Sequence, residues 1–412
     1  MRSAGGEVKE VNAQVKILVL NCGSSSLKYQ LFDMTDESVL AKGLVERIGI
    51  SGSRIKHSKG AESTVRETDI PDHTSAIKLV LELLQDAKLG ALKSLGELGA
   101  VGHRIVHGGE KNDKSALIDA SVIKDIEDCT YLAPLHNPAN LMGVRAMQTA
   151  LPGVPNVAAF DTAFHQTMPP KAYIYGIPYK YYENDRVRRY SFHGMSHAYV
   201  AARAAEILAK PASSLKIITC HMGNGSSVTA VDGGRSVDSS LGMGTTPGIL
   251  MGTRCGDVDA SVILYLMEKE ADLKKVSDIL HKESGLLGVS GVSSDLRDIE
   301  EAAAKGDERA KLAADILCTT VKKYIASYAA VMGGVDAIVF TAGIGENSDV
   351  TRREVTRGME FMGVKLDDSK NDGLRGKEAI ISADDSKVKV MVVPTNEELM
   401  IARDTRRLAE KS

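Results

Sequence analysis

The stretch KILVLNCGSSSLKYQLFD (residues 16–33) places one glycine and three serines between two apolar runs. The runs Lys16–Leu20 and Leu27–Phe32 have the β-branched, leucine-rich and alternating composition of strands, and only six residues separate them. The glycine and serine segment is therefore predicted to be a turn between two strands. A Walker-type phosphate loop would need the pattern GxxxxGK(S/T) opening a helix, and neither its second glycine nor the helix follows here.

The second half of the chain repeats this order of strand, small-residue turn and strand. Leu215–Cys220 is an apolar run, and Ser227–Val231 alternates after the intervening letters HMGNGS. A hairpin turn is expected at Asp232–Gly234, and a third strand and turn in VDAIVFTAGIGENS, residues 335–348. Strands that alternate with helices predict an α/β fold, and the repeated unit predicts a duplicated domain with a cleft between the copies.

Other segments have clear patterns of their own. Ser75–Leu89 has helical spacing, and Leu98–Val106 reads as a strand. A long amphipathic helix is expected around Leu312–Val331. Its predicted apolar face consists of Leu312, Ile316, Leu317, Val321, Tyr324, Ile325 and Tyr328. Such a stripe indicates domain core or a subunit contact more often than a ligand surface.

Composition narrows the class of protein. A chain of 412 residues has room for two or three domains, and its 43% hydrophobic and 25% charged residues are globular values. A net charge of −3 and the absence of Trp give no reason to expect a nucleic-acid partner. Five scattered cysteines without a CxxC pair favour a reducing compartment, which predicts the cytoplasm. No apolar run reaches the length of a membrane span, and residues 1–14 are expected to be a disordered extension.

Small residues after buried strands suit phosphate binding, because no side chain blocks the approach and backbone N–H groups can converge on the oxygens. Lys28 would then supply a charge for the terminal phosphates. One such turn alone is equally well explained as a flexible hairpin. Two similar turns together with the letters GIGEN favour phosphate binding.

Charged and imidazole side chains accompany these turns. Arg104 in GHRIVHGG and Arg254 in GTRCGDVD are candidate forks for a carboxylate or a phosphoryl group, although each could be a solvated loop arginine. Asp161 ends a short apolar strand, where it could face a ligand or cap a turn. His193 and His197 have helical spacing without the glutamate of an HExxH zinc site, so His197 is expected to be structural and His193 to face a cleft.

The letters PTNEEL open the last helix, with Thr395 or Asn396 as its cap and Glu397 and Glu398 in its first turn. Capping explains both glutamates, and nothing local selects a magnesium ligand.

Taken together, these segments resemble the acetokinase family, which belongs to the superfamily of acetate and sugar kinases, heat-shock chaperones and actin. The resemblance rests on motifs in family order from Lys16 onward: NCGSSSLKYQLF, GHRIVHGG, APLHNP, FDTAFHQTMP, FHGMSH, HMGNGSS, MGTRCGD, SSDLRDIE, FTAGIGENS and PTNEEL. It implies two duplicated ribonuclease-H-like, actin-like ATPase domains that flank a nucleotide cleft. Residues 15–163 with 397–412 would form the domain on the acyl and phosphate side, and 164–396 the nucleotide-binding domain.

The resemblance also implies roles for individual residues. The proposed phosphate and adenosine contacts are Ser24, Ser26, Lys28, His221, Met222, Gly223, Asn224, Gly225, Asp295, Leu296, Arg297, Gly343, Ile344, Gly345, Glu346 and Asn347. Asn21 and Glu397 would hold Mg²⁺, with Mn²⁺ as an alternative. The catalytic group would be Asp161, His193, Arg254 and Arg104, and the acyl site Arg104, Val106, Leu135 and Thr245.

The reaction so implied is reversible transfer of a phosphoryl group from ATP to acetate, giving ADP and acetyl phosphate, by a homodimer. A carboxylate is already a nucleophile, so positioning and charge neutralisation can carry the catalysis. Cys22 and Met195 depart from the family pattern, and Thr245 stands, without a gap, where the family has a proline of the acyl pocket. Propionate or butyrate therefore remains an alternative substrate, and an actin-like ATP-driven binding protein is the alternative from another class.

Overall fold

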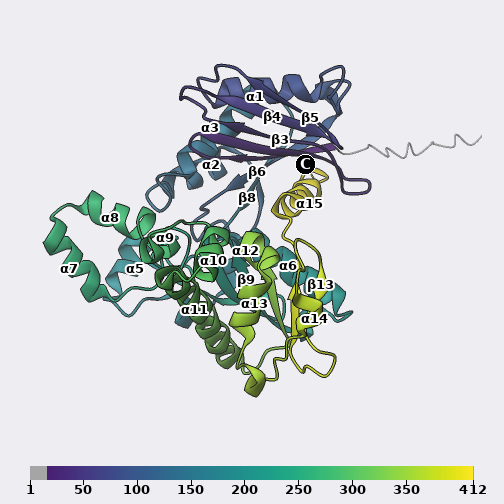
Figure 1. Ribbon diagram of the computed structural model, residues 1–412. Coiled ribbons are helices and arrows are strands. Elements are labelled where there is room, and N and C mark those ends of the chain that lie inside the picture. Colours follow the sequence, from purple (N-terminus) through teal and green to yellow (C-terminus); the bar gives the residue numbers. More distant parts are fainter. Residues whose placement is uncertain (1–15, 412) are drawn as a thin grey trace, which may run out of the picture.

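The computed structural model describes residues 16–411, and its chain forms two β-sheets with helices packed against both (Figure 1). The predicted extension over residues 1–14 lies outside the described residues. The first sheet has the order β5-β4-β3-β2-β1-β6-β8-β7. Its strands are β1 (Lys16–Cys22), β2 (Ser26–Asp33), β3 (Ser38–Glu46), β4 (Arg54–Lys59), β5 (Glu62–Glu67), β6 (Leu98–Ile105), β7 (Ala116–Leu117) and β8 (Asn156–Phe160).

The second sheet repeats the central part of the first. Its order is β11-β10-β9-β12-β14-β13. Its strands are β9 (Lys216–Met222), β10 (Ser226–Asp232), β11 (Arg235–Ser239), β12 (Ala337–Thr341), β13 (Ala379–Ile380) and β14 (Lys389–Val392). In each sheet an antiparallel three-strand meander is followed by two parallel strands, so β3-β2-β1-β6-β8 and β11-β10-β9-β12-β14 correspond. This correspondence confirms the duplicated α/β architecture.

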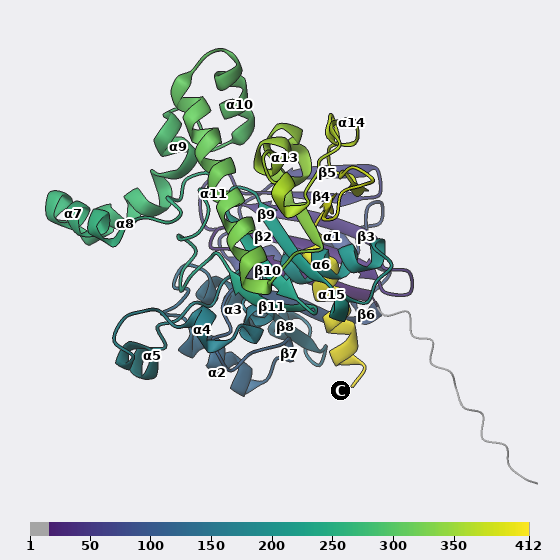
Figure 2. The ribbon, with the colours of Figure 1, turned by 90° about the horizontal axis from the view of Figure 1, so that it is seen from below.

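Helices cover both faces of each sheet (Figures 1 and 2). They are α1 (His73–Leu84), α2 (Ala120–Asp128), α3 (Asn137–Ala150), α4 (Pro170–Tyr173), α5 (Lys180–Asp185), α6 (Gly194–Ile207), α7 (Ala260–Glu270), α8 (Leu273–Lys282), α9 (Gly285–Ser290), α10 (Leu296–Ala304), α11 (Glu308–Met332), α12 (Ala342–Asn347), α13 (Asp349–Thr356), α14 (Asp368–Asn371) and α15 (Glu397–Ala409). Short 3₁₀ turns occupy Leu95–Glu97, Ala163–Thr167, Ala212–Ser214 and Glu360–Met362.

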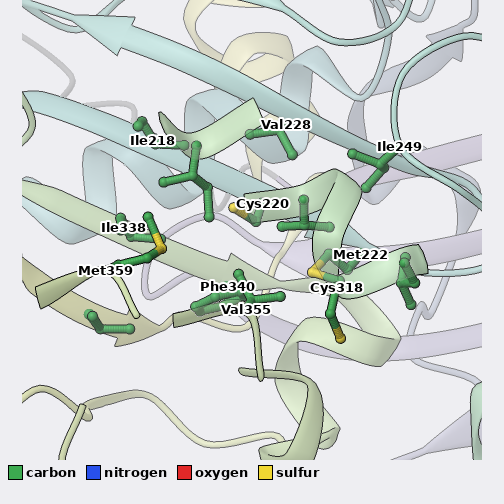
Figure 3. Close-up of a cluster of buried hydrophobic side chains, with 14 of the residues drawn as sticks. Ile218, Cys220, Met222, Val228, Ile249, Cys318, Ile338, Phe340, Val355 and Met359 are labelled. Atoms are coloured by element: carbon green, nitrogen blue, oxygen red, sulfur yellow. The ribbon is translucent and has the colours of Figure 1, made fainter. Parts of the chain in front are cut away.

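The alternation of strand side chains explains these layers. In the first sheet, Leu18 packs toward α1 and α3, whereas Ile17 packs toward α15. In the second sheet, Ile218 joins the core beneath α11 and Ile217 the core beneath α6. Figure 3 shows the α11 side, where Cys220 and Phe340 from the sheet lie near Cys318 of the helix. The central strands β1 and β9 are therefore buried on both faces.

The C-terminal helix returns to the first half of the molecule. The segment 393–396 leaves the second sheet after β14, and α15 then packs on β1, β6 and β8 of the first sheet (Figure 1). Asn396 caps this helix by accepting a hydrogen bond from the N–H of Leu399 at 3.1 Å. The residues that precede α15 therefore lie where the two halves meet.

Three local predictions need correction. The first helix ends at Leu84 rather than Leu89, because the carboxylate of Asp86 accepts the N–H groups of Lys88 and Leu89, both at 2.8 Å, and forms a turn. On α11, Leu312 is 52% exposed and does not belong to the buried face. Residues 342–347, expected as a turn, form the short helix α12.

Candidate active site

Two adjoining cavities share the β9–β10 turn. The smaller lies where the two halves meet, and the larger lies within the second half. The first, about 450 Å³, is lined by Asn21, Lys28, Arg104, His193, His221, Gly223, Asn224, Gly225, Arg254, Thr395, Glu397 and Glu398. The second, about 890 Å³, is lined by Gly223, Asn224, Ser294, Asp295, Leu296, Arg297, Glu300, Gly343, Ile344, Asn347, Ser348 and Arg375. Gly223 and Asn224 line both cavities, so a single elongated ligand can occupy the two and pass the β9–β10 turn.

The β1–β2 turn borders the first cavity. The N–H of Gly23 donates to the carbonyl of Ser26 at 2.8 Å, which closes the turn. Asn21 and Lys28 are paired across the two strands, and both line the cavity. The ammonium of Lys28 lies 2.5 Å from the carboxylate of Glu398. Ser24 lies in the turn and Ser26 begins β2, but neither residue lines either cavity.

The β9–β10 turn borders both cavities. It closes when the N–H of Gly223 donates to the hydroxyl of Ser226 at 3.1 Å. At Gly225 an added Cβ would lie 3.1 Å from Nη1 of Arg254 and 3.7 Å from Nε2 of His193. The missing side chain therefore lets both groups approach the turn. Met222, predicted to contact ATP, instead packs in the core with α11.

Arg104 and Asp161 form an ion pair at the ends of parallel strands β6 and β8. Nη2 of Arg104 donates to Oδ2 of Asp161 at 2.5 Å, and Asp161 is 1% exposed. The N–H of His193 also points at Oδ2, at 3.4 Å. Asp161 lines neither cavity, so it holds Arg104 from behind while the guanidinium faces the cavity.

Histidines pack around the hydroxyl of Ser227. Nδ1 of His193 lies 2.8 Å and Nε2 of His197 lies 2.7 Å from this oxygen. The rings of His193 and His221 are stacked with centroids 4.1 Å apart. Burial, followed by the charges of neighbouring histidines, lowers the pKa of His193 well below 6.5, and burial lowers the pKa of His221 to about 4. Both rings are therefore neutral near pH 7.

The backbone conformation of His193 and the guanidinium of Arg254, unpaired among the described residues, both indicate a ligand site. His193 has φ = +58°, a left-handed conformation that is strained in residues other than glycine. Nη1 of Arg254 donates to the carbonyl of Thr245 at 3.3 Å and approaches Sδ of Met251 at 3.7 Å. Within residues 16–411, Arg254 makes no ion pair. A half-buried guanidinium without a counterion in a cavity of this kind is suited to an anion.

A buried apolar cluster lies beside Arg254. It is the buried cluster of Val106, Ala133, Phe192, Leu241 and Met251. Leu135 is 74% exposed and does not join it, and Thr245 reaches the site through its carbonyl. The sequence interpretation missed Phe192 and Met251, although each stands close to a predicted site residue in the sequence.

A further residue missed from the sequence is His136, the N-cap of α3. Burial, and then the charges of Arg104 and Arg254, lower its pKa. The only sequence signal was its place in the motif APLHNP. It therefore lies close to the two arginines of the first cavity.

Glu397 is the best placed carboxylate for a divalent cation. Burial is the main cause that raises its pKa to about 7, and the nearby carboxylates of Asp161 and Glu398 add to the shift. A bound cation would stabilise the ionised carboxylate of Glu397 and so lower its pKa. Across the described residues, no group of three or more His, Cys, Asp or Glu side chains forms a metal site. Mg²⁺ commonly uses one or two carboxylates together with substrate phosphates, and Glu397 with Asn21 fits that arrangement.

The adenosine contacts predicted from the sequence meet in the larger cavity, with two exceptions. Asp295, Leu296, Arg297, Gly343, Ile344 and Asn347 line it. The carbonyl of Gly345 accepts from the buried Arg352 at 2.9 Å. The carboxylate of Glu346 accepts from backbone N–H groups. Ser294, Glu300, Ser348 and Arg375 also line the cavity and were not predicted.

Comparison with known proteins gives consistent results. The Acetokinase family profile matches residues 16–403. An acetate kinase of Thermotoga maritima is 59% identical over 400 residues, which cover 96% of this chain and 99% of the relative. An acetate kinase of Acetivibrio thermocellus is 59% identical over 398 residues, 96% of this chain and all (100%) of the relative.

Solved structures agree with this result. A crystal structure of Porphyromonas gingivalis acetate kinase has a TM-score of 0.93 at 52% identity and covers 96% of this chain and 99% of that one. A propionate kinase from Francisella tularensis has a TM-score of 0.89 at 39% identity, with 96% and 100% covered. Among the described helices, none has the length and apolar character needed to cross a bilayer. On sequence and structure together, the chain belongs to the acetokinase family.

Proposed function

We propose that this protein is an acetate kinase, which transfers the γ-phosphoryl group of ATP reversibly to a carboxylate oxygen of acetate with Mg²⁺ or Mn²⁺. The observation that carries the proposal is the position of the guanidinium of Arg254. It lies in the smaller cavity beside Gly225 and His193, and no carboxylate of the described residues pairs with it. A transferring phosphoryl group is an anion of the size and charge that would complete this site.

The acid would bind between Arg104 and the apolar cluster beside Arg254. Its carboxylate would accept from the guanidinium of Arg104, which Asp161 holds in place. Its methyl group would face the cluster that contains Val106 and Phe192. Because acetate is already ionised near pH 7, the reaction needs no strong base, and Asp161 acts as an orienting group. Leu135 and Thr245 stay proposed acyl contacts, Thr245 through its carbonyl.

Phosphoryl transfer would take place between the two turns. The backbone of Gly223–Gly225, with the ammonium of Lys28, would hold the phosphates. Neutral His193 would donate a hydrogen bond, and Arg254 would neutralise charge on the equatorial oxygens. The divalent cation, held by Glu397 and Asn21, would offset phosphate charge. Adenosine would occupy the larger cavity, between Asp295–Arg297 on one side and Gly343, Ile344 and Asn347 on the other.

The same proposal gives each half of the molecule its own role. Residues 15–163 with 397–412 would form the acyl and phosphate domain, and 164–396 the nucleotide-binding domain. The packing of α15 on the first sheet supports this division. All five cysteines are free, which supports a cytoplasmic location.

We further propose a homodimer formed through α7 and α8. These helices stand away from the rest of the molecule in both views (Figures 1 and 2). None of the residues of α7 is buried, although the helix carries the letters ASVILYLM, and Leu264 is 66% exposed. An apolar helix face of this kind is typical of an interface. Light scattering after gel filtration should give a molar mass twice that of one chain. In Leu264→Glu the molar mass should fall to that of one chain.

Propionate is the second candidate substrate, because a propionate kinase is among the structural relatives and the cluster beside Arg254 consists of apolar side chains. Values of kcat/KM for acetate, propionate and butyrate separate the three acids. Because one methylene is worth only about 1–3 kcal/mol, the difference between the acids is expected to be modest. A larger kcat/KM for propionate than for acetate would make propionate the preferred substrate.

Hydroxylamine trapping tests the proposal as a whole. With acetate and MgATP the enzyme should yield acetohydroxamate. Slow ATP hydrolysis with no product above a protein-free blank would instead favour an ATP-driven binding protein. Arg104→Ala should lower kcat and also raise the KM for acetate, and a normal KM would contradict the role given to Arg104.

A further inference from the structure

The side chain of Glu346 does not face the nucleotide cavity that its neighbours line. Its Oε1 accepts a hydrogen bond from the N–H of Ala342 at 2.8 Å and another from the N–H of Thr395 at 3.1 Å. Ala342 begins the helix that carries Gly343, Ile344 and Asn347 into the larger cavity. Thr395 lines the smaller cavity. One carboxylate oxygen therefore joins the walls of the two cavities.

The Ala342 end of this link is strained. Ala342 has φ = +62°, a left-handed conformation that a residue with a Cβ adopts only when its surroundings hold it there. The bond from its N–H to Glu346 lies within the same short helix and fixes the turn from β12 into α12. The carboxylate thus holds the segment from which the nucleotide contacts project.

The Thr395 end leads to the proposed phosphoryl-transfer site. Thr395 stands in the connection from β14 to α15, two places before Glu397. Its hydroxyl donates to the hydroxyl of Ser196 at 2.8 Å. The hydroxyl of Ser196 in turn lies 2.8 Å from Nδ1 of His221, whose ring stacks on His193. The path from Glu346 to these imidazoles is continuous.

The geometry of these bonds fits a proton on Nε2 of His221. The hydroxyl of Ser196 accepts from Thr395, and we assign its own proton to the bond with Nδ1 of His221, 2.8 Å away. Because the ring is neutral, Nδ1 as acceptor leaves the proton on Nε2. His221 lines the smaller cavity, so this tautomer gives the cavity a donor for a phosphate oxygen.

We propose that Glu346 is a positioning residue that ties the nucleotide-binding helix to Thr395, and that Thr395 thereby fixes Glu397 and the Nε2–H tautomer of His221. The inference rests on the proposed kinase function and deepens it. Glu346 itself makes no contact with ATP in this scheme. Its task is to hold the adenosine wall and the phosphoryl-transfer wall in one relative position.

Four variants test the link. Glu346→Ala removes the shared acceptor, and kcat should fall about 30-fold, which is within the range of losses seen when a partner that orients a functional group is removed. The calorimetric Kd for ADP should change less than about threefold. Glu346→Gln keeps an amide oxygen as acceptor and should stay within about threefold of the wild type in kcat. Thr395→Val should lower kcat about tenfold, and Thr395→Ser should restore it.

The tautomer of His221 gives a readout that needs no turnover. Imidazole ¹⁵N spectra should show a protonated Nε2 in the wild type and in Thr395→Ser, and a mixture in Thr395→Val. If Glu346→Gln lost as much activity as Glu346→Ala, the charge would be the requirement and the link would be wrong. A Kd for ADP that weakened in step with kcat, or an unchanged tautomer in Thr395→Val, would also overturn it. A wild type that makes no acetohydroxamate refutes the kinase and leaves the spectroscopic test intact.

Discussion

The β1–β2 and β9–β10 turns occupy equivalent places in the two sheets, and they differ in what they bring to the cavity. Both close from a glycine, Gly23 or Gly223, to a serine, Ser26 or Ser226. The first turn is followed by an exposed cation, since Lys28 has a side-chain exposure of 52%. The second is flanked by buried neutral histidines, and its cation, Arg254, comes from a distant loop.

This difference separates two electrostatic tasks. The ammonium of Lys28 is a half-exposed point charge on a flexible stem, paired with Glu398, and it suits the capture of a phosphate that arrives from solvent. The guanidinium of Arg254 is half-buried and held by the carbonyl of Thr245, so it needs little reorganisation when charge develops nearby. We therefore expect changes at the second turn to affect kcat and changes at the first to affect binding.

Arg254→Ala should have the largest effect. Loss of the guanidinium removes the cation that neutralises the transferring group, and kcat should fall about 10³-fold or more. Steady-state hydroxamate assays at saturating MgATP and acetate measure this. Arg254→Lys is the control, and it should recover only part of kcat because it keeps the charge and loses the fork. An alanine variant within tenfold of the wild type would remove Arg254 from the mechanism.

Gly225→Ser makes the second turn read like the first, where Ser25 stands at this place. The added Cβ would lie 3.1 Å from Nη1 of Arg254, so the guanidinium must move, and kcat should fall about 100-fold. The reciprocal change Ser25→Gly is the matched control and should stay within about threefold of the wild type. Equal losses in the two variants would mean that the turns do not differ in task.

These contrasts also show what the sequence could reveal. The strands beside each turn were predicted closely, because alternation of apolar side chains is a local signal. The apolar cluster beside Arg254 was predicted only at Val106. Val106 and Phe192 come from separate segments, and Leu135, chosen by resemblance, is exposed. Contacts between distant segments depend on the packing of both sheets, which no local pattern encodes.

Glu346 gives a second example of the same limit. Its place in GIGEN predicted a contact with ATP, yet its carboxylate accepts the N–H of Thr395, far along the chain. The helix α12 was likewise expected as a turn, because two glycines in five residues favour one. The long-range bond to Thr395 and the tertiary packing of α12 override that local preference.

Lys28→Met should have a smaller effect than either change at the second turn. The variant keeps the length of the stem and removes the charge, so the KM for ATP should rise about tenfold while kcat falls less. Glu398, the carboxylate beside Lys28, loses its partner but stays partly solvated. Lys28→Arg should keep a KM near that of the wild type. If Lys28→Met lowered kcat as much as Gly225→Ser, the first turn would share the task of the second.

The smallest effect is expected from pH. Burial and the neighbouring histidines hold the pKa of His193 well below 6.5, so the ring neither gains nor loses a proton between pH 6.5 and 8.5. At saturating MgATP, kcat should therefore change less than about twofold across that range. Glu397 behaves differently, because its pKa is raised to about 7 and its carboxyl binds a proton as the pH falls below that value. That proton competes with the cation, so the Mg²⁺ concentration for half-maximal rate should rise at pH 6 relative to pH 8. A fall in kcat near pH 7 that persists at saturating Mg²⁺ would show that a group of the second turn, His193 first, titrates during catalysis.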